Sequence, residues 1–199
     1  MCGIFGNASK RASSLEISSF HLLGIYNIER GKSSCGVTYD GEVYHGLDKD
    51  KLYSDFIKLR PMKPQSPLIF GHTRAPSNGG TVSPENSHPF GFGTYQDGFQ
   101  MVGVHNGTLK NHRELAEKYE IDMSEEIVKT QGAHSWTVNR AKIDSEVLLE
   151  ILWKTKSYDV LLDYIGTAAL VWTWPEEPNK VYLWSGASKH NQSDDDKAS

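Results

Sequence analysis

The sequence is poor in the features that mark secreted, membrane and nucleic-acid-binding proteins. Only two of its 199 residues are cysteine, which is too few for a disulfide framework. It has 21 Lys and Arg against 25 Asp and Glu, so no excess of positive charge favours nucleic acid or an anionic membrane. No apolar run approaches the roughly 20 residues of a membrane span. We therefore expect a cytoplasmic protein without a nucleic-acid or membrane partner.

The length and composition favour one folded domain with a sizeable core. Hydrophobic residues make up 38% of the chain and aromatic residues 11%, and the length is close to that of a single domain. We expect this domain to span residues 1–188. Residues 189–199 contain three consecutive Asp and have the composition of a disordered acidic tail.

Hydrophobic patterns predict a mixture of strands and helices. Strands are expected at 3–8, 35–39, 42–45, 68–73, 100–105, 167–174 and 180–184. Helices are expected at 13–28, 51–59, 111–119, from 144 onward and at 158–165, whereas residues 122–143 fit neither pattern. The strands at 35–39 and 42–45 are expected to form a hairpin around Asp40-Gly41, a favoured turn pair. The strands cluster in such hairpin-like pairs, which favours an α+β fold of antiparallel sheets flanked by helices.

The first predicted helix has both a start signal and an apolar face. Ser13 and Glu16 have the spacing of a capping box. The apolar residues on one face are Leu15, Leu22, Leu23 and Tyr26. Periodicity of this kind is typical of a helix that packs on a core.

Cys2 is the most reactive candidate because it directly follows the initiator methionine. Once Met1 is removed, a single residue carries a thiol and a free α-amine, and so it supplies both a nucleophile and a base. The simple alternative is a cysteine placed there by chance. The second cysteine, Cys35, is expected to be a small buried residue.

Three further positions carry groups suited to the same chemistry, each with a structural alternative. Arg74 precedes a long loop rich in Gly, Pro, Asn and Ser, and its guanidinium can bind a carboxylate, although a surface Arg is the simpler explanation. Asn106 and Gly107 can donate an amide and a backbone N–H to an oxyanion, or can form a turn. Asp144 can bind a substrate ammonium, or can act as a helix N-cap.

The order of these elements resembles that of the class II glutamine amidotransferases, the cysteine-headed branch of the N-terminal-nucleophile hydrolases. The resemblance runs from residue 2 to about 187 and implies a four-layer αββα sandwich of antiparallel sheets. The segments that carry it are Met-Cys-Gly-Ile-Phe-Gly at 1–6, Arg-Gly-Lys-Ser-Ser-Cys-Gly at 30–36, Gly-His-Thr-Arg at 71–74, Asn-Ser-His-Pro at 86–89, Val-His-Asn-Gly at 104–107 and Asp-Ser-Glu-Val at 144–147.

The resemblance implies a role for each candidate residue. Cys2 would attack the side-chain amide of L-glutamine and form a glutamyl thioester, with its own α-amine as the base. Arg74 would hold the α-carboxylate of glutamine and Asp144 its α-ammonium, while Asn106 and Gly107 would stabilise the oxyanion. No cofactor or metal is implied, and the eight histidines show no His-x-x-x-His spacing.

The loop after Arg74 departs from the family pattern. Ala75 stands where the family often has a large aromatic residue, and Ser77-Asn78 stands where one branch has Thr-His. Ser77 keeps a hydroxyl and Asn78 keeps part of the hydrogen-bonding capacity. Both are therefore expected to contact glutamine, in a loop whose closure differs from that of its relatives.

The leading hypothesis is a glutaminase whose ammonia passes to an acceptor synthase on a separate polypeptide. It is motivated by a sequence without a sugar-isomerase, phosphoribosyl, ATP-pyrophosphatase or Walker motif. Ala75 and Asn78 leave open a stand-alone amide hydrolase with another substrate. A non-catalytic homologue that binds or regulates is the third reading, and retention of Met1 would favour it.

Overall fold

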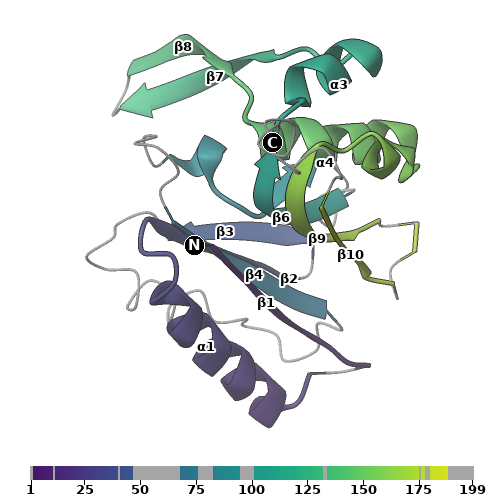
Figure 1. The fold of residues 1–199 in the computed structure, drawn as a ribbon. Helices are drawn as coiled ribbons and strands as arrows, with labels where there is room; N and C mark the ends of the chain where they lie inside the picture. The colour runs from purple at the N-terminus through teal and green to yellow at the C-terminus, as the bar shows by residue number, and fades with distance from the viewer. Residues whose placement is uncertain are drawn as a thin grey trace, which may run out of the picture. The chain divides into compact units, whose positions relative to one another are not determined.

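The computed structural model describes residues 2–10, 12–39, 41–46, 68–75, 83–94, 101–131, 134–174, 176–177 and 180–187. The chain divides into two compact units (Figure 1). Unit 1 contains Met1–Asn106 and Ala169–Ser185, and unit 2 contains Gly107–Ala168 and the residues from Gly186 onward. The helix expected at 51–59 and the tail expected at 189–199 lie outside the described residues.

The first sheet of unit 1 has four strands in the order β1-β4-β2-β3, and the pairings within it are antiparallel. Its strands are β1 (Gly3–Ala8), β2 (Ser34–Tyr39), β3 (Glu42–Gly46) and β4 (Leu68–Arg74). The predicted hairpin between β2 and β3 is confirmed, and Gly41 in its turn has a φ of 75°, a conformation that glycine adopts without steric cost. Cys35 on β2 is 1% exposed, as expected of a structural cysteine.

Helix α1 (Ser14–Ile28) begins at the predicted capping box, in which Ser13 and Glu16 bond each other's backbone N–H groups. The face that it buries is not the predicted one. Its buried residues are Ile17, Phe20, Gly24 and Ile28, whereas Leu15, Leu22, Leu23 and Tyr26 are 46–76% exposed. The Phe20 ring instead lies 5.1 Å from that of Phe5 on β1, so contact with the sheet decided which side of the helix faces inward.

The second sheet has the strand order β10-β9-β6-β5 and lies largely in unit 1. Its strands are β5 (Phe90–Phe92), β6 (Met101–Leu109), β9 (Gly166–Thr173) and β10 (Tyr182–Ala187), and the short 3-10 helix η1 (Pro84–Asn86) precedes β5. Phe70 of the first sheet shares an apolar cluster with Val102 and Val104 of β6. Unit 1 therefore contains three of the predicted layers, namely a helix and two sheets that pack through this cluster.

Unit 2 contains the helices predicted near 111–119 and from 144 onward, together with a hairpin that the sequence did not reveal. Its elements are α3 (His112–Lys118), β7 (Ser124–Gln131), β8 (His134–Ala141), α4 (Asp144–Thr155) and the 3-10 helix η2 (Asp159–Leu162). Strands β7 and β8 pair only with each other among the described strands. They occupy the stretch that fitted neither pattern, and the expected helix at 158–165 is reduced to η2. No helix in the described ranges is long and apolar enough to cross a membrane.

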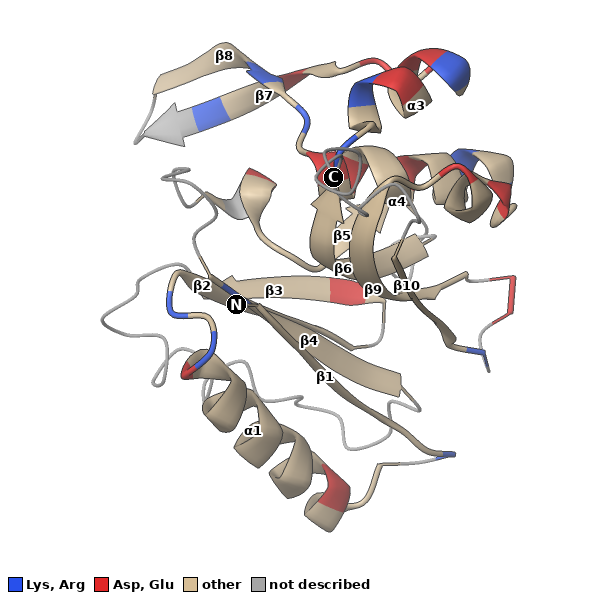
Figure 2. Cartoon of the chain, in the orientation of Figure 1, with Lys and Arg blue, Asp and Glu red and all other residues tan. Residues whose placement is uncertain are grey.

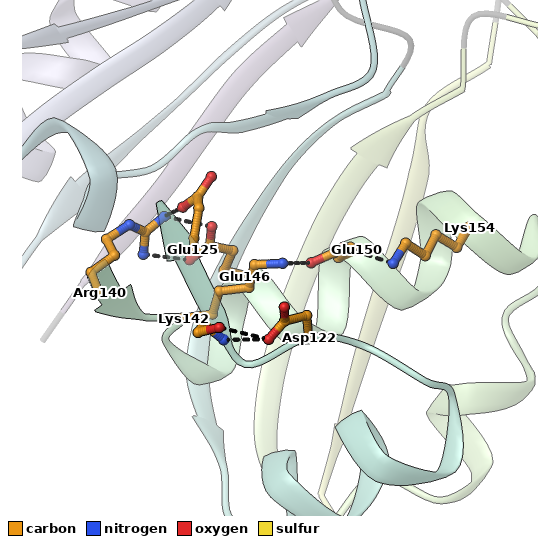
Figure 3. Close-up of polar contacts among 8 residues, drawn as sticks. Asp122, Glu125, Arg140, Lys142, Glu146, Glu150 and Lys154 are labelled. Carbon is orange, nitrogen blue, oxygen red and sulfur yellow. Dashed lines mark hydrogen bonds and ion pairs between the residues drawn. The ribbon is translucent and has the colours of Figure 1, made fainter. Parts of the chain in front are cut away.

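Buried ion pairs join the hairpin to helix α4 within unit 2. The Arg140 guanidinium donates two hydrogen bonds, of 2.8 and 2.6 Å, to the Glu146 carboxylate, and it also contacts Glu125 (Figure 3). Lys142 pairs with Glu150 at 2.6 Å. Glu146 and Glu150 are only 5% and 7% exposed. Figure 2 shows these charges on the hairpin and on α4, in contrast to the strands of the first sheet, which are almost free of charge.

Candidate active site

The strand register brings Cys2 to the end of the strand that carries Arg74. The last pair of the antiparallel β1–β4 ladder joins Gly3 to Thr73, so one further step places Cys2 opposite Arg74. Glycine at position 3 allows the chain to reach this place, because a Cβ on Gly3 would lie 2.0 Å from the Asn27 side-chain oxygen. The half-buried Cys2 and the buried Arg74 are therefore neighbours although 72 positions separate them in the sequence.

The contacts of Cys2 involve its thiol and its carbonyl group. The backbone N–H of Ala75 donates to Cys2 Sγ at 3.4 Å. The Asn106 side-chain amide donates to the carbonyl oxygen of Cys2 at 3.2 Å. A carboxamide nitrogen carries two N–H groups, so Asn106 keeps a second donor beside the cysteine.

Asn106 and Gly107 lie inside strand β6 rather than in a turn, so the turn alternative is wrong. Asn106 is half-buried and Gly107 is exposed. Gly107 is the first residue of unit 2. Their peptide link fixes the two groups as neighbours along the strand, and successive residues of a strand direct their side chains to opposite faces.

The turn at residues 30–36 holds the backbone of Arg74 in place. The N–H of Ser33 donates to the Arg74 carbonyl oxygen at 2.9 Å. A Cβ on Gly31 would come within 2.7 Å of the backbone of Thr73 and Arg74, so only glycine allows this approach. Thr73 is fixed as well, because its hydroxyl donates to the carbonyl of Asn27 at 2.8 Å. This segment therefore has a structural role.

Two buried imidazoles lie beside Arg74, and reasoning from the sequence assigns a role to neither of them. His72 is 1% exposed and His88 5% exposed, and their ring centroids are 4.3 Å apart. Burial, followed by the charges of His105 and Arg74, lowers the pKa of His72 to about 3. Burial is also the main cause that holds the pKa of His88 well below its ordinary value. Both rings are therefore neutral at pH 7. The signals in the sequence are the strand alternation that places His72 and Arg74 on one face and the family-like segments at 71–74 and 86–89, which contain the two histidines.

Asp144 is the first residue of α4 and not its N-cap. Ile143 occupies the N-cap position, and no side chain caps the helix. The Asp144 carboxylate accepts a hydrogen bond of 2.9 Å from the backbone N–H of Leu109. Burial, together with the charge of Asp144, raises the pKa of Tyr164. Within unit 2, Asp144 is thus tied to the strand end that carries Gly107, and one of its two oxygens makes this bond.

Ser77 and Asn78 lie outside the described residues. Among the described ranges, no group of three or more His, Cys, Asp or Glu side chains could hold a metal ion. The structure therefore brings together Cys2, Arg74 and Asn106 within unit 1, and it places Gly107 and Asp144 in unit 2.

Comparison with known proteins gives relatives by sequence and by fold. No family model matches the chain. It is 29% identical over 174 residues to the glutamine–fructose-6-phosphate aminotransferase (isomerizing) of Haemophilus influenzae, a match that covers 84% of this chain and 24% of the relative. It is 30% identical over 157 residues to the enzyme of the same description from Nostoc sp., with coverage of 76% and 21%. The chain thus spans about a quarter of the length of these relatives.

Solved structures share its fold at lower sequence identity. The glutamine phosphoribosylpyrophosphate amidotransferase of B. subtilis, in complex with ADP and GMP, aligns with a TM-score of 0.58 and 20% identity over 93% of this chain and 37% of that one. An allosteric regulatory enzyme of purine biosynthesis aligns with a TM-score of 0.57 and 20% identity, over 87% of this chain and 35% of that one. These alignments confirm the predicted α+β fold of the N-terminal-nucleophile hydrolases.

Proposed function

Given that this chain is a relative of the class II glutamine amidotransferases, we propose that it hydrolyses the side-chain amide of L-glutamine to glutamate and ammonia. One observation carries the proposal. Cys2 lies next to Arg74 and accepts a hydrogen bond from Asn106, so a nucleophile, a cation and an amide donor meet within unit 1. These three residue types can supply the nucleophile, the carboxylate-binding cation and an oxyanion donor for glutamine hydrolysis.

The chemistry begins at Cys2 once Met1 has been removed. The α-amine takes the thiol proton, and the sulfur attacks the amide carbon of glutamine. The C–N bond then breaks, and ammonia leaves with the proton from the α-ammonium group. The glutamyl thioester that results is hydrolysed by water, which releases glutamate and restores the thiol.

The roles proposed for four further residues would account for the rate and for the choice of substrate. The second amide N–H of Asn106 and the N–H of Gly107 would stabilise the oxyanion of the tetrahedral intermediate, where one donor is worth roughly 3 kcal/mol. Arg74 would bind the α-carboxylate through its guanidinium, and Asp144 would bind the α-ammonium. A free amino acid supplies both groups, whereas a glutamine within a peptide supplies neither.

The ammonia is proposed to pass to an acceptor enzyme. The sequence relatives are aminotransferases that use glutamine and fructose 6-phosphate according to their names. For this chain the acceptor is proposed to be a separate polypeptide. Purification of the chain from its native host, followed by a glutamine-dependent assay on the proteins that copurify, tests this part of the proposal.

Glutamate release from L-glutamine tests the hydrolysis itself. Protein whose intact mass shows the loss of Met1 should release glutamate steadily, and Cys2→Ala should abolish the release. Cys35→Ala is the matched control, because Cys35 is buried in the core away from solvent and should not be needed for turnover. Absence of glutamate release from the processed wild-type protein, alone and with its copurified partner, would refute the proposal.

A further inference from the structure

The imidazole pair beside Arg74 is built into the face of the first sheet that meets the second. Phe70, His72 and Arg74 alternate along β4 and share this face. Gly36 of β2 lies opposite His72, and a Cβ there would lie 2.2 Å from the backbone oxygen of His88. Because Gly36 has no side chain, the segment that contains His88 and Pro89 can lie directly over the sheet at this position.

Both ends of this segment are fixed by contacts. The His88 ring lies against the His72 ring at an interplanar angle of 39° and is edge-on to Phe90, with centroids 4.7 Å apart in the second pair. His45, opposite Gly36 on β3, places its Nε2 atom 3.1 Å from the carbonyl oxygen of Pro89. The pair is therefore held by three strands and is not a mobile surface feature.

Among the described residues, Arg74 forms no ion pair with a carboxylate, and the charged or titratable groups of the cluster are bases. The groups that lower the pKa of His88, after burial, are His72, His105, Arg74 and His45, all of them bases. Arg74 is 8% exposed, and its Nη1 atom has no hydrogen-bond partner among the described residues. The same holds for Nε2 of His72 and for both ring nitrogens of His88. A buried guanidinium in such surroundings has a strong preference for an anionic ligand.

We propose that His72 and His88 are positioning and specificity-determining residues for Arg74. Their rings form a neutral wall that fixes the guanidinium without compensating its charge. The guanidinium can therefore bind the α-carboxylate of a free amino acid. The inference rests on the proposed function, in which Arg74 binds that carboxylate. Protonated rings would repel the guanidinium from its place, and a carboxylate in the wall would compete with the substrate. Neutral rings do neither, which gives the pair a role that ordinary packing does not require.

Asp and Asn side chains have nearly the same size but differ in charge, so the two substitutions at His88 distinguish this role from simple packing. In the Cys2→Ala protein, which cannot turn over substrate, binding of L-glutamine and of its α-amide is measured by titration calorimetry. His88→Asp should bind L-glutamine at least about tenfold more weakly than His88→Asn, because the new carboxylate pairs with Arg74. The preference of the parent protein for L-glutamine over the α-amide should fall towards unity in His88→Asp only.

Several outcomes would overturn the inference. Equal affinity of the Asp and Asn variants for L-glutamine would show that the charge of the wall is irrelevant, and absence of binding by the Cys2→Ala parent would show that Arg74 is no receptor. If the variants fail to fold, nuclear magnetic resonance of the histidine rings in the wild-type protein gives the answer, since a protonated His72 or His88 at pH 6 contradicts a neutral wall. Lack of glutamate release with intact, wall-dependent binding would refute the proposed function alone.

Discussion

Acidification from pH 8 to pH 5 should destabilise this protein by about 2 kcal/mol through His72 alone. The folded protein lowers the pKa of this ring to about 3 through burial and the charges of His105 and Arg74, whereas an unfolded histidine titrates near 6.5. Between these values the unfolded chain binds one more proton than the folded one, so stability falls as the pH falls. The contribution is fully present above pH 6.5 and is lost progressively down to pH 3.

The size of the effect follows from the width of this window. Each pH unit below 6.5 costs about 1.4 kcal/mol for one such group, and pH 5 lies 1.5 units below, which gives about 2 kcal/mol. His88 acts in the same direction, because burial also holds its pKa well below the ordinary value. Two kcal/mol is a large share of the 5–15 kcal/mol that typically stabilises a folded protein.

Urea unfolding of the wild type and of His72→Gln at pH 8, 7, 6 and 5 measures the contribution. The variant should lose about 2 kcal/mol less between pH 8 and pH 5 than the wild type, whatever its stability at pH 8. His134→Gln, a substitution of an exposed histidine, is the control. Parallel pH dependences for wild type and His72→Gln, within about 0.5 kcal/mol, would refute the assignment of a neutral buried ring.

Three other substitutions have defined outcomes. Arg140→Met should destabilise the fold by about 3–5 kcal/mol in urea unfolding, because it leaves the buried Glu146 unpaired; Lys118→Met, which breaks an exposed ion pair, should cost less than about 1 kcal/mol. Asn106→Ala should lower kcat for glutamine about 100- to 1,000-fold with little change in KM. A rise in KM of this size with an unchanged kcat would contradict an oxyanion role. Gly36→Ala should lower the Tm by several degrees, since its Cβ would meet a backbone oxygen at 2.2 Å, and an unchanged Tm would show that the segment above it moves freely.

Local signals in the sequence were sufficient for most strands and for the start of the first helix. Strand β1 has the predicted bounds, and Ser13 and Glu16 form the predicted capping box. The hairpin around Gly41 was also predicted, because turn residues and alternation act over a few neighbouring positions. The same kind of signal failed at Asp144, where a carboxylate suited to an N-cap instead bonds the N–H of Leu109, 35 positions earlier.

The order of the chemical groups can be read directly from the sequence, with Cys2 first, Arg74 at the end of a strand and Asn106 on another. Which of these groups meet, and what surrounds them, depends on how distant segments pack together. This packing selected the Phe20 side of α1 over the equally periodic leucine side, because periodicity shows that a face exists but not which surface it contacts. It also brought the rings of His72 and His88 to a centroid distance of 4.3 Å beside Arg74. Burial, which lowers the pKa of both rings, arises only when segments distant in sequence exclude water from the same place.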